Sequence, residues 1–187
     1  MKKLLLSALL GGFVAFLWYT LSWTVLHLHP TQKFTDETAV AAVLKANAAP
    51  EAGVYVLPGD CGPDEAARAA HMKALQDGPF LFGVVRSGAQ SFSMPASIVK
   101  SLLSQMVCAY LFASLLLCTR PMSYGARVFF VLQAALLAGL LCHLPPMIWW
   151  GMPTTWVLRE FLDLAVAWTL AGLVIAKFAN PIPQAKP

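Results

Sequence analysis

The feature that most constrains this chain is a set of four apolar runs, each long enough to cross a lipid bilayer as a helix. The first is an uncharged stretch of 23 residues, Leu4 to Leu26, which would extend roughly 34 Å as a helix, against about 30 Å of hydrocarbon. The other runs are 98–118, 128–144 and 156–179. Only 12% of the 187 residues are charged, about half the share in soluble domains. The sequence predicts a mainly α-helical membrane protein with a four-helix transmembrane bundle.

The first run has the features of an uncleaved signal anchor. Lys2 and Lys3 precede it, and it is longer than the roughly 7 to 15 apolar residues of a cleaved signal peptide. The bulky residues 16–19 stand where a cleavage site needs small ones. We therefore expect residues 1–29 to form a first transmembrane helix that stays attached.

The charge distribution predicts which way the chain crosses the membrane. Four spans place both termini and the loop between spans two and three on one side. That side holds six basic residues and no acidic one: Lys2, Lys3, Arg120, Arg127, Lys177 and Lys186. Because cytoplasmic loops are enriched in Lys and Arg, we expect cytoplasmic termini. No basic helix face is present to hold phosphates, so no nucleic-acid partner is expected.

Tryptophan and proline residues mark the predicted outer ends of the spans, where amphipathic rings favour the headgroup layer. Trp23, Trp149, Trp150 and Trp156 all fall there. Pro145 and Pro146 lack N–H donors and are predicted to end the third helix. Met147–Thr155 is then expected to form a Trp-rich hairpin at the interface.

Residues 30–97 are predicted to form a small extracytoplasmic α/β domain between the first two spans. Thr35 and Pro63 each precede acidic residues, as at helix starts. The pattern predicts a helix, a strand, a helix and a strand at 35–48, 53–57, 63–76 and 80–86, with the strands side by side. A domain of about 60 residues buries only about 60% of its surface, so we expect it to lean on the membrane surface or on a partner.

Ionisable side chains near the predicted outer ends of the spans form the candidate site. They are His27, His29, His143, Glu160 and Asp163. Imidazole and carboxylate are common ligands of zinc, iron and copper, so a metal ion, haem or proton site is one interpretation. The favoured interpretation is structural: Arg159 and Asp163, four residues apart, can pair on one helix face. No metal-binding spacing such as H-E-x-x-H occurs, so no cofactor is predicted.

Cysteines and small residues give weaker signals. None of the four cysteines forms a C-x-x-C pair, which argues against a thioredoxin-type site. Cys61 has three open interpretations: a surface residue without a role, a reactive thiol, or a bond to Cys142. Small residues predict close helix packing where they recur four positions apart, at Ser7, Gly11 and Ala15, at Ala135 and Gly139, and at Ala167 and Ala171.

Three stretches of the chain carry a resemblance. Residues 16–27, Asp36 and Glu37 with Val40, and residues 53–58 (GVYVLP) together resemble a group of uncharacterised bacterial inner-membrane proteins. The resemblance implies a bacterial envelope protein with one N-terminal anchor, a small extracytoplasmic domain and three further spans, and no catalytic activity.

These observations leave three hypotheses for function. The first is a non-enzymatic accessory or interaction subunit, whose partners besides the lipid bilayer would be other membrane subunits or a second copy of the chain. The second is a redox, metal- or haem-handling protein that uses the outer His, Glu and Asp residues. The third is a small carrier or channel, which would need oligomerisation because few polar residues could line a pore.

Overall fold

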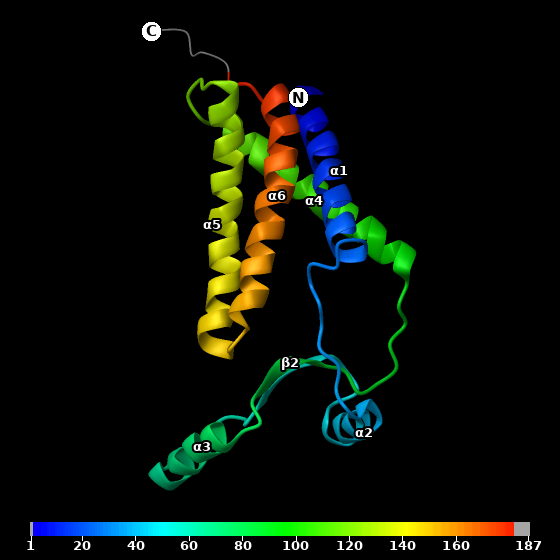
Figure 1. Ribbon diagram of the computed structural model, residues 1–187, viewed down its shortest axis with the longest axis vertical. Helices are drawn as coiled ribbons and strands as arrows, with labels where there is room; N and C mark the ends of the chain where they lie inside the picture. The colour runs from blue at the N-terminus through cyan, green and yellow to red at the C-terminus, as the bar shows by residue number, and fades with distance from the viewer. Residues whose placement is uncertain (1, 182–187) are drawn as a thin grey trace. The chain divides into compact units, whose positions relative to one another are not determined.

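The computed structural model describes residues 2–181 (Figure 1). The chain divides into two compact units: a helical unit made of residues up to Pro30 and from Ser93 onward, and a smaller unit, Thr31–Phe92. The smaller unit is therefore an insertion between the first two long helices.

The helical unit contains four long helices. They are α1 (Lys2–Thr24), α4 (Met94–Leu117), α5 (Tyr124–Trp150) and α6 (Thr154–Phe178). Each is long and apolar enough to cross a membrane, which confirms the prediction of a mainly helical, multi-pass membrane protein. Helix α4 begins four residues before the apolar run at 98, because the Ser93 side chain accepts a hydrogen bond from the Ala96 N–H and caps it.

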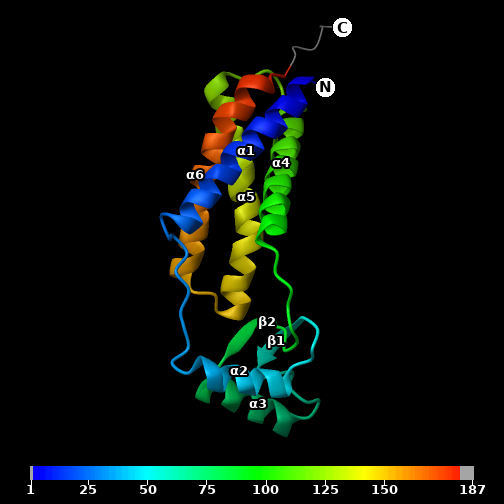
Figure 2. The same ribbon diagram turned by 90° about the vertical axis from the view of Figure 1, so that its right-hand side faces the viewer.

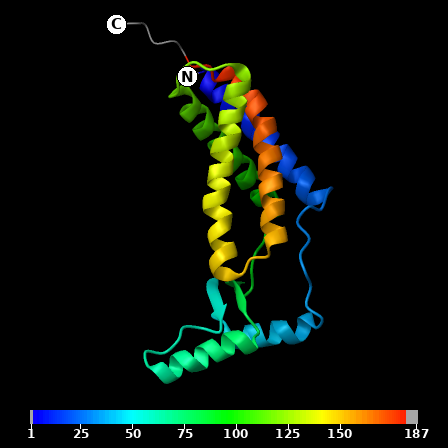
Figure 3. The same cartoon turned by 60° about the vertical axis from the view of Figure 1, so that its left-hand side comes forward.

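The four helices pack through small residues. Helix α1 packs against both α4 and α6, and α5 packs against α6, as Figures 1 and 3 show. The residues of the predicted small-residue stripes are all buried, which confirms their packing role: Ser7, Gly11, Ala15, Ala135, Gly139, Ala167 and Ala171. Among the glycines, the tightest position is Gly12, where an added Cβ would lie 2.5 Å from Met106 Cα of α4. Only a glycine allows two backbones to come this near.

One end of the helical unit holds most of its basic residues. The start of α1, the end of α6 and the α4–α5 loop all lie at that end, while the α5–α6 turn lies at the other (Figures 1 and 2). The basic residues there are Lys2, Lys3, Arg120, Arg127 and Lys177; Lys186 lies outside the described residues. Their gathering agrees with the charge pattern, and the side of the membrane they face remains a prediction.

Arg127 adds positive charge at this end of the unit and also links two of its helices by hydrogen bonds. Its Nε donates to the Ala176 carbonyl at 3.0 Å, and its Nη1 donates to the Met122 carbonyl at 2.9 Å and to Asn180 Oδ1 at 2.8 Å. The side chain thus joins the start of α5 to the end of α6, where a helix leaves carbonyl groups without intrahelical partners.

The expected end of the third span at Pro145 and Pro146 is wrong. Both prolines lie inside α5, which continues to Trp150, because proline φ angles are already helical and membrane helices tolerate the missing N–H groups. The helix ends at Gly151, whose φ of 64° is left-handed and whose N–H donates to the Pro146 carbonyl. Residues 151–153 form a short turn in place of the expected longer hairpin.

The smaller unit contains α2 (Glu37–Asn47), β1 (Gly53–Leu57), α3 (Glu65–Asp77) and β2 (Leu81–Val85). This order and the side-by-side strands confirm the sequence prediction, and the pairing is antiparallel, with Gly53 opposite Val85. The residue that caps α2 is Asp36, not the expected Thr35: its carboxylate accepts a hydrogen bond from the Ala39 N–H at 2.9 Å.

The smaller unit is held by local hydrogen bonds and has no core. The Ser87 hydroxyl donates to the Ala48 carbonyl at 2.8 Å, and the Ala49 N–H donates to the Tyr55 hydroxyl at 2.8 Å. None of residues 31–92 is buried. Its exposed large apolar side chains include Phe34, Val43, Val54, Leu57, Met72, Phe80, Val84 and Phe92. Hydrophobic burial therefore contributes little to the stability of this unit.

Candidate functional site

The candidate site lies between the end of α1 and the first turns of α6, and Asp163 is buried within it. This side chain is 1% exposed. Trp18 Nε1 donates to Asp163 Oδ1 at 2.5 Å, and the Ser22 hydroxyl donates to Oδ2 at 2.7 Å. Both donors come from α1, so the carboxylate links two helices that are far apart in the sequence.

His29 enters the site from the segment that follows α1. The chain turns back on itself there, with the Leu28 N–H donating to the Ser22 carbonyl at 3.1 Å. The imidazole then stacks on Trp23, with ring centroids 4.2 Å apart and planes 9° from parallel, and meets the edge of Trp156 at 5.6 Å. Two indole rings thus close off the imidazole, whose side chain is fully buried.

The imidazole of His29 faces two carboxylates. His29 Nε2 lies 3.5 Å from Glu160 Oε1 and 3.6 Å from Asp163 Oδ2, just beyond the 2.7–3.2 Å of a hydrogen bond. Neither ring nitrogen has a hydrogen-bond partner among the residues that the structure describes. Buried polar atoms without a hydrogen-bond partner are rare and lower the stability of the folded state.

The electrostatics of the site call for positive charge. An ionised Asp at the bilayer centre costs about 2.5–3.5 kcal/mol on insertion scales, and such residues usually pair inside the bundle. Trp18 and Ser22 are neutral donors, which stabilise a carboxylate without cancelling its charge. A positive charge close to the two carboxylates would therefore be favourable. Within residues 2–181, no group of three or more His, Cys, Asp or Glu side chains is arranged to hold a metal ion.

Three of the five predicted site residues come together: His29, Glu160 and Asp163. His27 is exposed, and its Nδ1 lies 2.9 Å from the Val25 carbonyl. His143 lies away from the carboxylates and meets Phe161 edge-on, with ring centroids 5.8 Å apart.

The expected pair between Arg159 and Asp163 is wrong. Arg159 is exposed, whereas Asp163 points into the bundle towards α1. The spacing of four residues does place the two positions near each other along α6. The Asp163 carboxylate nevertheless accepts its hydrogen bonds from Trp18 and Ser22 of α1.

Trp18 and Ser22 are the site residues that the sequence reasoning missed. They continue the buried stripe of α1 that begins with Ser7, Gly11 and Ala15, at steps of three and four residues. A polar or N–H-bearing side chain on a buried membrane stripe needs a partner, so this periodicity is the signal that could have identified them.

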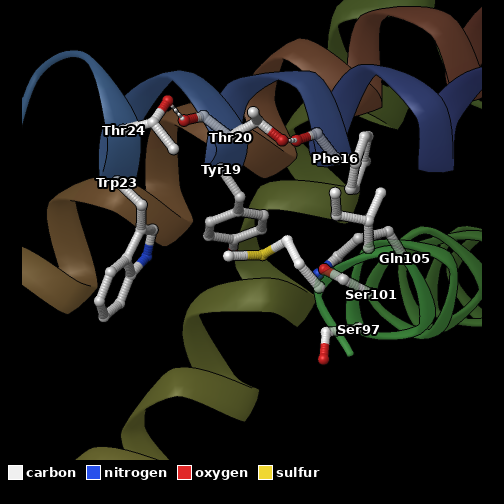
Figure 4. A pocket seen from close by; sticks show the side chains of 10 residues that line it. Phe16, Tyr19, Thr20, Trp23, Thr24, Ser97, Ser101 and Gln105 are labelled. Atoms are coloured by element: carbon white, nitrogen blue, oxygen red, sulfur yellow. Dashed lines mark hydrogen bonds between the residues drawn. The ribbon is translucent and has the colours of Figure 1, made fainter. Parts of the chain in front are cut away.

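A groove opens on the other side of α1, between α1 and α4 (Figure 4). The two helices meet at Gly12 and Met106, and the groove lies between their ends beyond this contact, with a volume of about 560 Å³. Its walls are Phe16, Tyr19, Thr20, Trp23, Thr24, Met94, Ser97, Ile98, Ser101 and Gln105. Trp23 therefore lines the groove and also stacks on His29.

The two threonine hydroxyls that α1 contributes to this groove are bonded within their own helix. Thr20 donates to the Phe16 carbonyl at 2.9 Å, and Thr24 donates to the Thr20 carbonyl at 2.6 Å, as Figure 4 shows. The groove opens between two membrane-length helices, so acyl chains or a neighbouring apolar helix would fill it.

The four cysteines do not add to either site. Cys61, Cys108, Cys118 and Cys142 are all free. The three interpretations of Cys61 remain predictions, because Cys61 and Cys142 belong to different units.

Comparisons of the chain with protein-family models, with curated proteins and with solved structures found no match.

Proposed function

We propose that this chain is a non-enzymatic interaction subunit of a bacterial inner-membrane complex. Its termini would face the cytoplasm and the unit Thr31–Phe92 would lie outside, as the basic residues at one end of the helical unit favour. The smaller unit would bind another membrane subunit. The observation that carries this proposal is the apolar surface that this unit leaves uncovered.

One face of the two-stranded sheet is part of this uncovered surface. Val54 and Val84 are paired across the strands and are 67% and 74% exposed. Neighbouring pairs of this kind stabilise a sheet when they are covered, and a sheet of two strands is marginal by itself in water. A partner that covered this face would remove apolar area from water and stabilise the unit at the same time.

Site-specific photo-crosslinking tests the proposal in intact cells. A benzophenone amino acid at position 54 or 84 should give one discrete crosslinked protein band, and the same substitution at the exposed Gln90, outside the strands, should give none. Val54→Asp and Val84→Asp should abolish co-purification of that protein in mild detergent, while Gln90→Asp keeps it. A chain that crosslinks only to lipid, or that purifies alone and monodisperse, would contradict the proposal.

The proposed orientation has its own test. A reporter fused to the C-terminus should be active in the cytoplasm, and protease added outside spheroplasts should cut within residues 31–92. A periplasmic C-terminal reporter, or a protected insertion, would overturn the orientation without bearing on whether the unit binds a partner.

A further inference from the structure

We propose that His29, Glu160 and Asp163 form a buried proton-binding site, in which His29 takes up one proton and serves as the counter-ion of the two carboxylates. The bound proton would fasten the end of α1 to α6. This inference is independent of the proposed partner of the smaller unit.

Charge balance is the first argument for the bound proton. Asp163 is buried and accepts hydrogen bonds from two neutral donors. Among residues 2–181, His29 is the only basic side chain within 4.0 Å of either carboxylate. A buried carboxylate without a counter-ion is strongly unfavourable, and a proton on the imidazole supplies that counter-ion.

Geometry is the second argument. An imidazolium donates from both ring nitrogens, and His29 Nε2 already lies at 3.5 Å and 3.6 Å from its two acceptors. A shift of about 0.7 Å would bring either contact to the 2.7–2.9 Å of a charge-assisted hydrogen bond. Nε2 would then gain a partner, while Nδ1 gains none from this shift.

The surroundings of His29 define what can titrate there. From α6 the titratable groups are Glu160 and Asp163. From α1, Tyr19 interacts electrostatically with both carboxylates, and the ring that contacts His29 itself is that of Trp23. Glu160 keeps 21% of its side chain exposed, so a proton from water can reach the imidazole past this carboxylate.

The position of His29 in the chain gives the bound proton its effect. His29 and Pro30 are the last residues of the helical unit before the chain enters the smaller one. The imidazolium would hold this segment against α6. Loss of the proton would leave a neutral ring beside two carboxylates and weaken the hold, so the segment should loosen as pH rises.

Tryptophan fluorescence of the full chain in detergent micelles tests the proposal, because a protonated imidazole quenches an indole on which it stacks. Between about pH 5 and pH 8, where imidazoles titrate, wild-type emission should rise with pH. His29→Gln and Trp23→Phe should each abolish this rise, whereas His27→Gln, which changes an exposed histidine two residues earlier, should keep it.

A second variant keeps the test decisive if His29→Gln fails to fold. Asp163→Asn retains a carbonyl oxygen for Trp18 and removes the charge opposite His29, so it should shift the midpoint of the fluorescence change to lower pH. Emission that is flat in wild type, a rise that survives in His29→Gln, or an unchanged midpoint in Asp163→Asn would each overturn the proposal.

Discussion

Replacing Gly12 by alanine tests whether the contact between α1 and α4 is a backbone contact. The added Cβ would lie 2.5 Å from Met106 Cα, 2.6 Å from Met106 N and 2.9 Å from the Gln105 carbonyl carbon. All three neighbours are backbone atoms, which cannot rotate away as the end of a side chain can. The helices would have to separate by about 0.9 Å to restore an ordinary contact, and a gap of 0.5–1 Å removes a quarter to a half of each dispersion contact.

The expected cost follows from two opposing effects. Overpacking a tight interface costs typically 1–3 kcal/mol, and a backbone clash belongs near the upper value. Alanine in place of an interior helical glycine returns about 1 kcal/mol of helix propensity. We therefore expect Gly12→Ala to lower the free energy of unfolding by about 2 kcal/mol.

Reversible unfolding in mixed micelles, followed by far-UV circular dichroism and tryptophan fluorescence, measures this free energy. Gly125→Ala is the matched control, because nothing lies within 4 Å of its added Cβ, and it should leave stability unchanged or slightly raised. Gly139→Ala should fall between them, since its nearest neighbours, at 3.2 Å and 3.3 Å, are ends of the Phe161 and Leu164 side chains. Equal stability of Gly12→Ala and Gly125→Ala would refute the backbone contact.

Three further variants test other contacts by the same unfolding measurement. Asp163→Ala should lower stability by about 2–4 kcal/mol, because it leaves Trp18 and Ser22 without an acceptor; a loss no larger than in Asp163→Asn would contradict this. Arg127→Gln should cost about 2 kcal/mol, since hydrogen bonds from a charged group are lost, and an unchanged value would mean that the bonds are replaced by water. Gly151→Val should cost about 1–2 kcal/mol, because a β-branched residue is strained at a φ of 64°; Gly125→Ala is again the reference.

Elements whose signal is local were predictable from the sequence. The apolar runs have the length of a bilayer-crossing helix and yielded all four long helices. The short helices of the insertion were marked by acidic residues at their starts, such as Asp64 after Pro63, whose carboxylate accepts a hydrogen bond from the Ala67 N–H. Caps and turns act through neighbours in the chain, so a sequence pattern contains most of the needed information.

Features that depend on a distant partner were not predictable in this way. Asp163 binds Trp18 and Ser22, which lie more than 140 positions away in the sequence, and does not pair with Arg159. The continuation of α5 through Pro145 overrides a strong local preference, because lipid and neighbouring helices favour an unbroken helix over exposed backbone. The candidate cluster was therefore recognised in part, as a set of residue types at similar depth, but its contacts were not.

The central place of α1 has a consequence for how the chain is processed and assembled. A peptidase that cut just after Thr24 would remove the main neighbour of α4, expose Ile175 where it now meets Gly11, and strip the Asp163 carboxylate of both its donors. Among the four long helices, α1 comes earliest in the described chain and is also the one on which α4 and α6 both pack. Until α4 and α6 are inserted, the buried residues of α1 would lack the helices that cover them.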